Sequence, residues 1–98
     1  MSGEKFDGKY IKDSRGFTLG RIEGNYIKDD RGFTKGRVDN NYIKDDRGFT
    51  LGRVDGDQVK DSRGFSKGKV KDFTIHGIER EKDVMIVAVY HFLIKKIF

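Results

Sequence analysis

The 98-residue sequence contains no cysteine, no proline and no tryptophan. Without cysteine, the fold has neither a disulfide framework nor thiolate chemistry. The absence of proline, together with regularly spaced apolar residues, argues against disorder although 38% of the residues are charged. Residues 1–13 are charged and lack the apolar stretch of a secretory signal. We therefore expect a small single domain in the cytoplasm.

A sixteen-residue motif accounts for about two thirds of the chain. Its copies span residues 10–25, 26–41, 42–57 and, in a weaker form, 58–73, and half-copies lie before the first and after the last. Repetition at so short a period means that one unit cannot bury its apolar face alone and must share a core with its neighbours. We therefore assign residues 1–77 to one repeat domain.

Two kinds of turn alternate within the repeats. Gly24-Asn25, Asn40-Asn41 and Gly56-Asp57 are two-residue connectors in which Gly or Asn can adopt positive φ, as the primed hairpin turns require. The segment 13–16 and its three copies end in glycine, which fits a type I turn followed by a left-handed glycine in a β-bulge. Together these turns predict an up-and-down series of short β-hairpins.

Strand register follows from the two-residue turns, because flanking residues become partners and side chains alternate between faces. One face then carries apolar pairs: Phe6–Ile11, Ile22–Ile27, Val38–Ile43, Val54–Val59 and Val70–Ile75. We expect the position of Leu19, Lys35, Leu51 and Lys67 to lie at a rim. The phenylalanines that follow each bulge are expected to cap the edge of the core: Phe17, Phe33, Phe49 and Phe65.

A hairpin with one aliphatic pair is unstable in isolation. A radial arrangement about a common axis would gather the pairs at the centre, whereas a linear stack of hairpins would leave two exposed sheet ends. We favour the radial arrangement. The predicted fold class is thus mainly β, with short hairpins arranged about a pseudo-rotation axis and an apolar helix at the C-terminus.

The repeat YIKD(S/D)RGFTxGR(I/V)(D/E)G resembles that of the small bacterial beta-flower domains, and specifically their four-fold type. The resemblance covers residues 5–77 and implies hairpins that radiate about a pseudo-rotation axis. It implies no established activity or ligand, so it transfers no functional residues. The fourth copy departs from the motif at Gln58 and at residues 71–73, where the last turn of the array is expected to differ.

Residues 78–98 form a different kind of segment. Acidic residues precede the apolar run 84–94, and two lysines follow it, which is the order that a helix macrodipole favours. The β-branched residues favour a strand instead, but we predict a helix. The run would extend roughly 16 Å as a helix, too short for a hydrocarbon layer of about 30 Å.

A helix that is apolar on every side has more than one face to bury. One face of the tail is expected to plug the open end of the repeat domain. The other faces predict either self-association or an interfacial membrane anchor with Lys95 and Lys96 at the headgroups. The residues assigned to this oligomer or anchor segment are Val84, Ile86, Val87, Tyr90, Phe92, Leu93, Ile94 and Phe98.

Catalytic and metal-binding patterns are missing from the sequence. His76 and His91 lie alone in separate segments, without the spacing of a metal pair. The pairs Asp29-Asp30 and Asp45-Asp46 lack the glycine and glutamate positions of a calcium loop and are better explained as turn formers. The prediction is a protein that is not an enzyme and that uses no cofactor, metal or small-molecule substrate.

One surface nevertheless has the composition of a binding site. The register places Arg21, Arg37 and Arg53 on the face opposite the apolar pairs, with Tyr26 and Tyr42 beside them. Such a face is either a solvated surface or a repeated cationic and aromatic site for an anionic polymer, nucleic acid or glycan. The preferred function is a structural or protein-interaction module that self-associates through its tail; the alternative is peripheral binding to a membrane or an anionic polymer.

Overall fold

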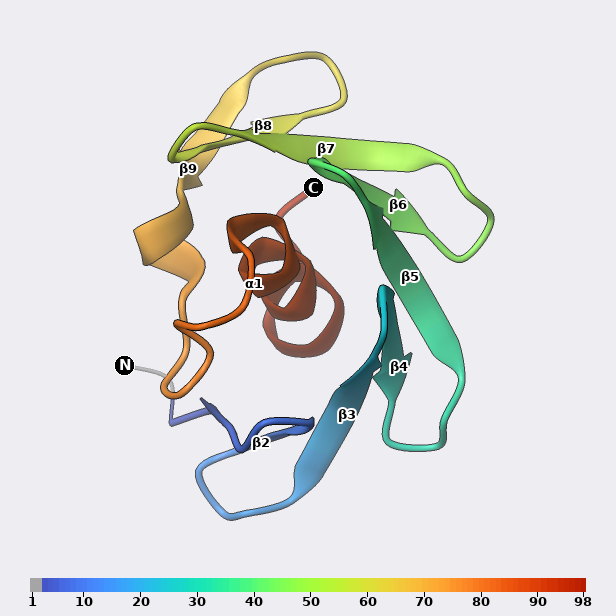
Figure 1. Cartoon of the computed structure of the whole chain (residues 1–98), viewed down its shortest axis with the longest axis vertical. Coiled ribbons are helices and arrows are strands. Elements are labelled where there is room, and N and C mark those ends of the chain that lie inside the picture. The colour runs from blue at the N-terminus through green and yellow to red at the C-terminus, as the bar shows by residue number, and fades with distance from the viewer. Residues whose placement is uncertain (1–2) are drawn as a thin grey trace.

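The computed structural model describes residues 3–98, which form a ring of β-hairpins around one helix (Figure 1). The nine strands pair antiparallel with their sequence neighbours in a single sheet. Their bounds are β1 Lys5–Phe6, β2 Tyr10–Lys12, β3 Thr18–Glu23, β4 Tyr26–Asp29, β5 Thr34–Asp39, β6 Tyr42–Asp45, β7 Thr50–Asp55, β8 Gln58–Asp61 and β9 Ser66–Lys69. The predicted up-and-down series of hairpins is confirmed.

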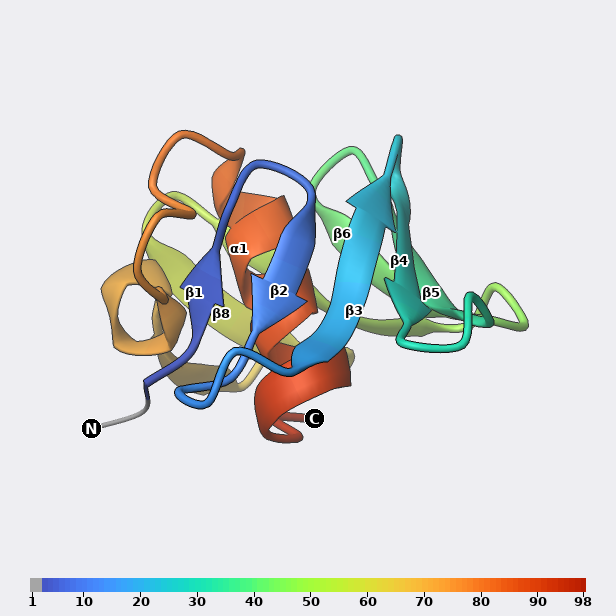
Figure 2. The same ribbon diagram turned by 90° about the horizontal axis from the view of Figure 1, so that it is seen from below.

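The ring has two different ends (Figure 2). The two-residue turns gather beside the start of the central helix, and we call this the narrow end. The longer loops, residues 13–17, 29–33, 45–49 and 61–65, spread outward at the opposite end, where the C-terminus also lies. We call this the wide end.

The register within the hairpins is the predicted one. Phe6 pairs with Ile11, Ile22 with Ile27, Val38 with Ile43, and Val54 with Val59. The β-bulges follow Ile11, Ile27, Ile43 and Val59, which are themselves completely buried. The core of the ring is therefore made of branched aliphatic side chains contributed in turn by every hairpin.

The repeated aspartate explains why each long loop has the same shape. Oδ1 of Asp45 accepts hydrogen bonds from the backbone N–H groups of Arg47 and Phe49, both at 2.9 Å. The same pair of bonds is made by Asp13, Asp29 and Asp61. Gly48 and the equivalent glycines have φ near +90°, a conformation that favours glycine. The acidic motif is thus a turn former, as predicted.

The C-terminal segment is helical and occupies the centre of the ring (Figure 1). The α-helix α1 spans Asp83–Val89 and continues as one π-helical turn, η2, over Tyr90–Ile94. All six residues from Val84 to Val89 are buried. A helix that is apolar on every side is accommodated here because the hairpins surround it, so a single chain buries all of its faces.

Strand glycines allow the helix end to approach the sheet. Gly20, Gly36 and Gly52 are buried in the middle of β3, β5 and β7. A Cβ added at Gly52 would lie 2.5 Å from both the carbonyl oxygen of Lys60 and the ring of Phe98. A Cβ at Gly36 would likewise meet the ring of Phe92, and one at Gly20 would lie 2.8 Å from the side chain of Leu93. The strand glycine in each of the first three repeats therefore makes room for one side chain of the C-terminal segment.

Two sequence-based expectations are wrong. Val70 and Ile75 are buried but do not form a fifth hairpin pair, because Val70–Phe73 is a 3-10 turn (η1) and His76 bridges to Lys5 on β1. No glycine or asparagine is available there to form a two-residue turn. The four loop phenylalanines do not cap the core either: each is 64–66% exposed.

Candidate binding surfaces

The outer wall of the ring carries the predicted row of tyrosine and arginine. Tyr26 on β4 is the cross-strand partner of Arg37 on β5, and Tyr42 on β6 that of Arg53 on β7. Tyr10 and Arg21 form the same pair. The three tyrosines are 38–48% exposed, so their rings are accessible from solvent. The structure thus brings all five predicted wall residues onto one face, where equivalent residues of successive repeats lie two strands apart.

Carboxylates neutralise the lysines of this wall but not all of its arginines. Lys44 pairs with Asp39 and Lys60 with Asp55, each at 3.2 Å. In the first full repeat the acid is Glu23, whose longer side chain reaches both Lys28 and Arg21; these hydrogen bonds lower the pKa of the Glu23 carboxyl. The aspartates at the equivalent positions, Asp39 and Asp55, are too short to reach an arginine as well as a lysine.

As a result, two of the three wall arginines have no acidic partner among residues 3–98. Across residues 3–98, neither Arg37 nor Arg53 has a carboxylate oxygen within 4.0 Å. Their guanidinium groups extend along the wall toward the next loop: a Cβ at Gly48 would lie 3.4 Å from Nη2 of Arg37. Arg53 has the same relation to Gly64, at 3.7 Å. The two cations therefore lie beside the glycines that precede Phe49 and Phe65.

The predicted oligomer or anchor segment is divided by the structure. Val84, Ile86 and Val87 are buried inside the ring, which satisfies them without any partner. Tyr90, Phe92, Leu93, Ile94 and Phe98 are partly exposed and pack against the core from the wide end. Lys95 and Lys96 beside them are exposed. Only the second group is available for contact with another molecule.

His91 fixes the course of the chain at the wide end. Its Nδ1 accepts hydrogen bonds from the backbone N–H groups of Ile97, at 2.9 Å, and Phe98, at 3.3 Å. Burial, and then the positive charge of Lys96, lower the pKa of His91 to about 4. The imidazole of His91 is therefore neutral at pH 7, and its role is to hold Phe98 beside Gly52.

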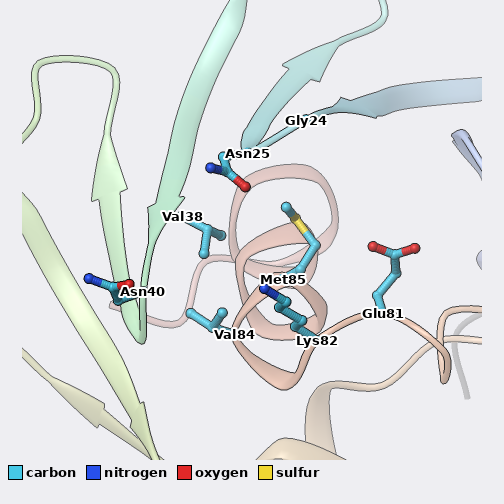
Figure 3. A pocket seen from close by; sticks show the side chains of 8 residues that line it. All are labelled: Gly24, Asn25, Val38, Asn40, Glu81, Lys82, Val84 and Met85. Carbon is cyan, nitrogen blue, oxygen red and sulfur yellow. The ribbon is translucent and has the colours of Figure 1, made fainter.

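A hollow of about 310 Å³ lies at the narrow end, between the two-residue turns and the start of α1 (Figure 3). Asn25, Asn40, Glu81 and Lys82 surround an apolar floor that includes Met85.

Within residues 3–98, no three His, Asp or Glu residues are placed to hold a metal ion. Over the same residues, no helix combines the length and apolarity that crossing a bilayer requires.

Comparison with known proteins decides the family. The family of 5-fold beta-flower proteins matches residues 2–92, nearly the whole chain. The protein belongs to this family. No curated protein and no solved structure matches it. The beta-flower fold predicted from the repeats is confirmed. The predicted four-fold type is not confirmed, because the matching family is five-fold. The central helix α1 lies within the matched residues.

Sequence reasoning overlooked the loop phenylalanines as surface residues, although the repeats contain a signal for them. The fourth copy replaces the wall tyrosine with Gln58 and the wall arginine with Lys69, yet retains Arg63-Gly64-Phe65. Asp and Gly in this loop have structural tasks, but the exposed Arg and Phe side chains do not. Their retention in every copy of the beta-flower repeat marks the loop tips as a further candidate surface.

Proposed function

We propose that this beta-flower protein is a non-catalytic interaction module, a rigid ring that engages a partner through its wide end. The observation that supports this most directly is the distribution of exposed apolar side chains. The helix fills the ring, while the long loops that carry the exposed phenylalanines lie at the same end as the partly exposed residues of the C-terminal segment. Exposed apolar groups collected in this way are typical of interaction sites.

Substitutions confined to the wide end test this proposal. Phe33 and Phe49 contribute little to the core, so replacing both with serine should leave the melting temperature unchanged while removing association with a partner. Gln58→Ser, on the outer wall, is the matched control because Gln58 is exposed as well. Retained association in the phenylalanine variant would refute an engagement through this end.

Self-association through the C-terminal segment has a narrower basis than the sequence indicates. The candidate contacts are Phe92, Leu93 and Ile94, because the preceding turns are buried in the ring. Sedimentation velocity over a range of concentrations tests it: a self-associating protein should become monomeric on Ile94→Glu and remain associated on Asn41→Glu at the narrow end. A wild-type protein that is monomeric throughout would rule self-association out.

The outer wall favours a second candidate, an anionic polymer such as nucleic acid. Arg37 and Arg53 lack carboxylate partners and lie beside accessible tyrosines, which suits phosphate contact together with stacking of bases. Retention on single-stranded DNA at low salt should fall on Arg37→Gln and Arg53→Gln but not on Arg80→Gln at the narrow end. Equal retention of all variants, or none by the wild type, would eliminate this candidate.

A further inference from the structure

The loop tips combine an exposed aromatic ring with neighbouring cations. Phe49 is 64% exposed and follows Arg47, and the guanidinium of Arg37 from the preceding hairpin lies beside Gly48. Arg63 and Arg53 stand in the same relation to Phe65. Arg37 and Arg53 have no carboxylate within reach in the part of the chain that the structure describes. Each of these tips thus presents an exposed phenyl ring, with one arginine two residues before it and the guanidinium of a wall arginine beside the preceding glycine.

The wide end carries a small excess of basic residues. The four loop segments, residues 13–19, 29–35, 45–51 and 61–67, carry six basic and six acidic residues, so the excess of basic residues at this end comes from Lys95 and Lys96. The first aspartate of each loop turns one oxygen inward onto the backbone; at Asp61, these hydrogen bonds from Phe65 and Arg63 lower the carboxyl pKa although burial raises it. At the narrow end, acidic residues outnumber basic ones in the turns and residues 76–83.

We infer that the wide end docks on a bilayer containing anionic lipids, with the loop phenylalanines inserted at the level of the headgroups and the flanking arginines on the phosphates. This inference rests on the proposed engagement through the wide end and names the partner. Guanidinium groups match phosphate geometry, and aromatic side chains are stable where one side is apolar and the other wet.

The arrangement of the tips favours a bilayer over a second copy of the chain. The loops that carry the phenylalanines are separate and spread around the edge of the ring (Figure 1), whereas a protein interface needs a contiguous, complementary core. A flat, fluid surface can contact all of the tips and the C-terminal segment together. Two wide ends, each with an excess of basic residues, would also repel one another.

A single tryptophan reports insertion directly, because the natural sequence has none. The Phe49→Trp variant should shift its emission to shorter wavelength when vesicles of phosphatidylcholine with phosphatidylserine are added, and lipids brominated in the acyl chain should quench it. Lys9→Trp, on an exposed turn at the narrow end, is the matched control and should show neither effect. An unchanged spectrum of Phe49→Trp, or an equal shift of Lys9→Trp, would overturn the inference.

Flotation of the full chain with the same vesicles gives the energetic test. Each Phe→Ser change at positions 33, 49 and 65 should weaken partitioning roughly fivefold, and the triple variant about 100-fold. Tyr26→Ser with Tyr42→Ser, on the wall, should partition as the wild type does. Flotation that survives the triple substitution would overturn the inference, as would equal binding to vesicles of phosphatidylcholine alone.

Sedimentation velocity of the same variants without lipid separates the two levels of the proposal. A wild-type chain that does not float but self-associates, and that loses self-association in the triple variant, would refute the bilayer while supporting engagement through the wide end. Flotation through the tyrosine wall instead of the phenylalanine tips would refute both.

Discussion

Replacing Gly52 with alanine should destabilise the protein more than its small size suggests. Gly52 lies in the middle of β7 with an ordinary strand conformation, so alanine has no backbone strain there. Its Cβ, however, would lie 2.5 Å from the carbonyl oxygen of Lys60 and 2.5 Å from the ring of Phe98. The ring can move, but the carbonyl belongs to the neighbouring strand and cannot move without disturbing the ladder.

Overpacking of this kind costs about 2–3 kcal/mol in the free energy of unfolding. Combining Gly52→Ala with Phe98→Ala removes the ring but not the carbonyl clash, so the double variant should be less destabilised than the sum by about 1 kcal/mol. Gly56→Ala is the control: φ there is +64° and no atom lies within 4 Å of a Cβ, so only the backbone conformation is penalised, by about 1 kcal/mol.

Urea unfolding followed by circular dichroism measures the stability of the wild type and of these four variants. If Gly52→Ala is no less stable than Gly56→Ala, or if its effect adds fully to that of Phe98→Ala, the C-terminal segment does not lie against the strand glycines and the reasoning is refuted.

Three further predictions concern the loops and the helix end. Asp45→Ala should lower the free energy of unfolding by about 1–2 kcal/mol in urea titrations, because two backbone N–H groups lose their acceptor. Asp45→Asn, whose side-chain oxygen can still accept, should retain most of the wild-type stability. The free energy of unfolding should fall as the pH drops from 6.5 toward 4, because His91 becomes protonated over this range in the unfolded chain but not in the folded protein. The loss should be about 1–2 kcal/mol at pH 5 and should be absent in His91→Gln. Phe33→Ser should leave the thermal midpoint within about 1 °C, since this side chain is 66% exposed.

Much of the ring could be predicted because its turns and strand pairs are determined by residues close together in the sequence. A two-residue turn fixes which residues pair, and alternation then places Ile27 and Ile43 on the inside and Arg37 on the outside. The acidic first residue and the glycine of each long loop identify a turn without any knowledge of the fold. These features depend on neighbours in the chain, so a short stretch of sequence determines them.

Features that depend on closure of the ring could not be predicted in the same way. The apolar character of Val84–Val89 indicates burial but not what surrounds the helix, and only the complete ring shows that one chain suffices. The exposure of Phe33 was missed because a bulge interrupts the alternation that the register argument uses. A fifth hairpin was wrongly predicted because the apolar spacing of Val70 and Ile75 does not reveal that Val70 leads into a 3-10 turn.

The unfolding of a chain that ends after Ile78 tests most directly whether the hairpins depend on the helix. Residues 84–89 are buried against β5, β6 and β7 as well as η1, and their removal would expose the aliphatic side chains along the inside of the ring. Loss of these contacts exceeds the total stability of about 5–15 kcal/mol expected for a small domain. We predict no cooperative unfolding transition in the truncated chain; a sharp transition at a midpoint close to that of the full chain would contradict the account.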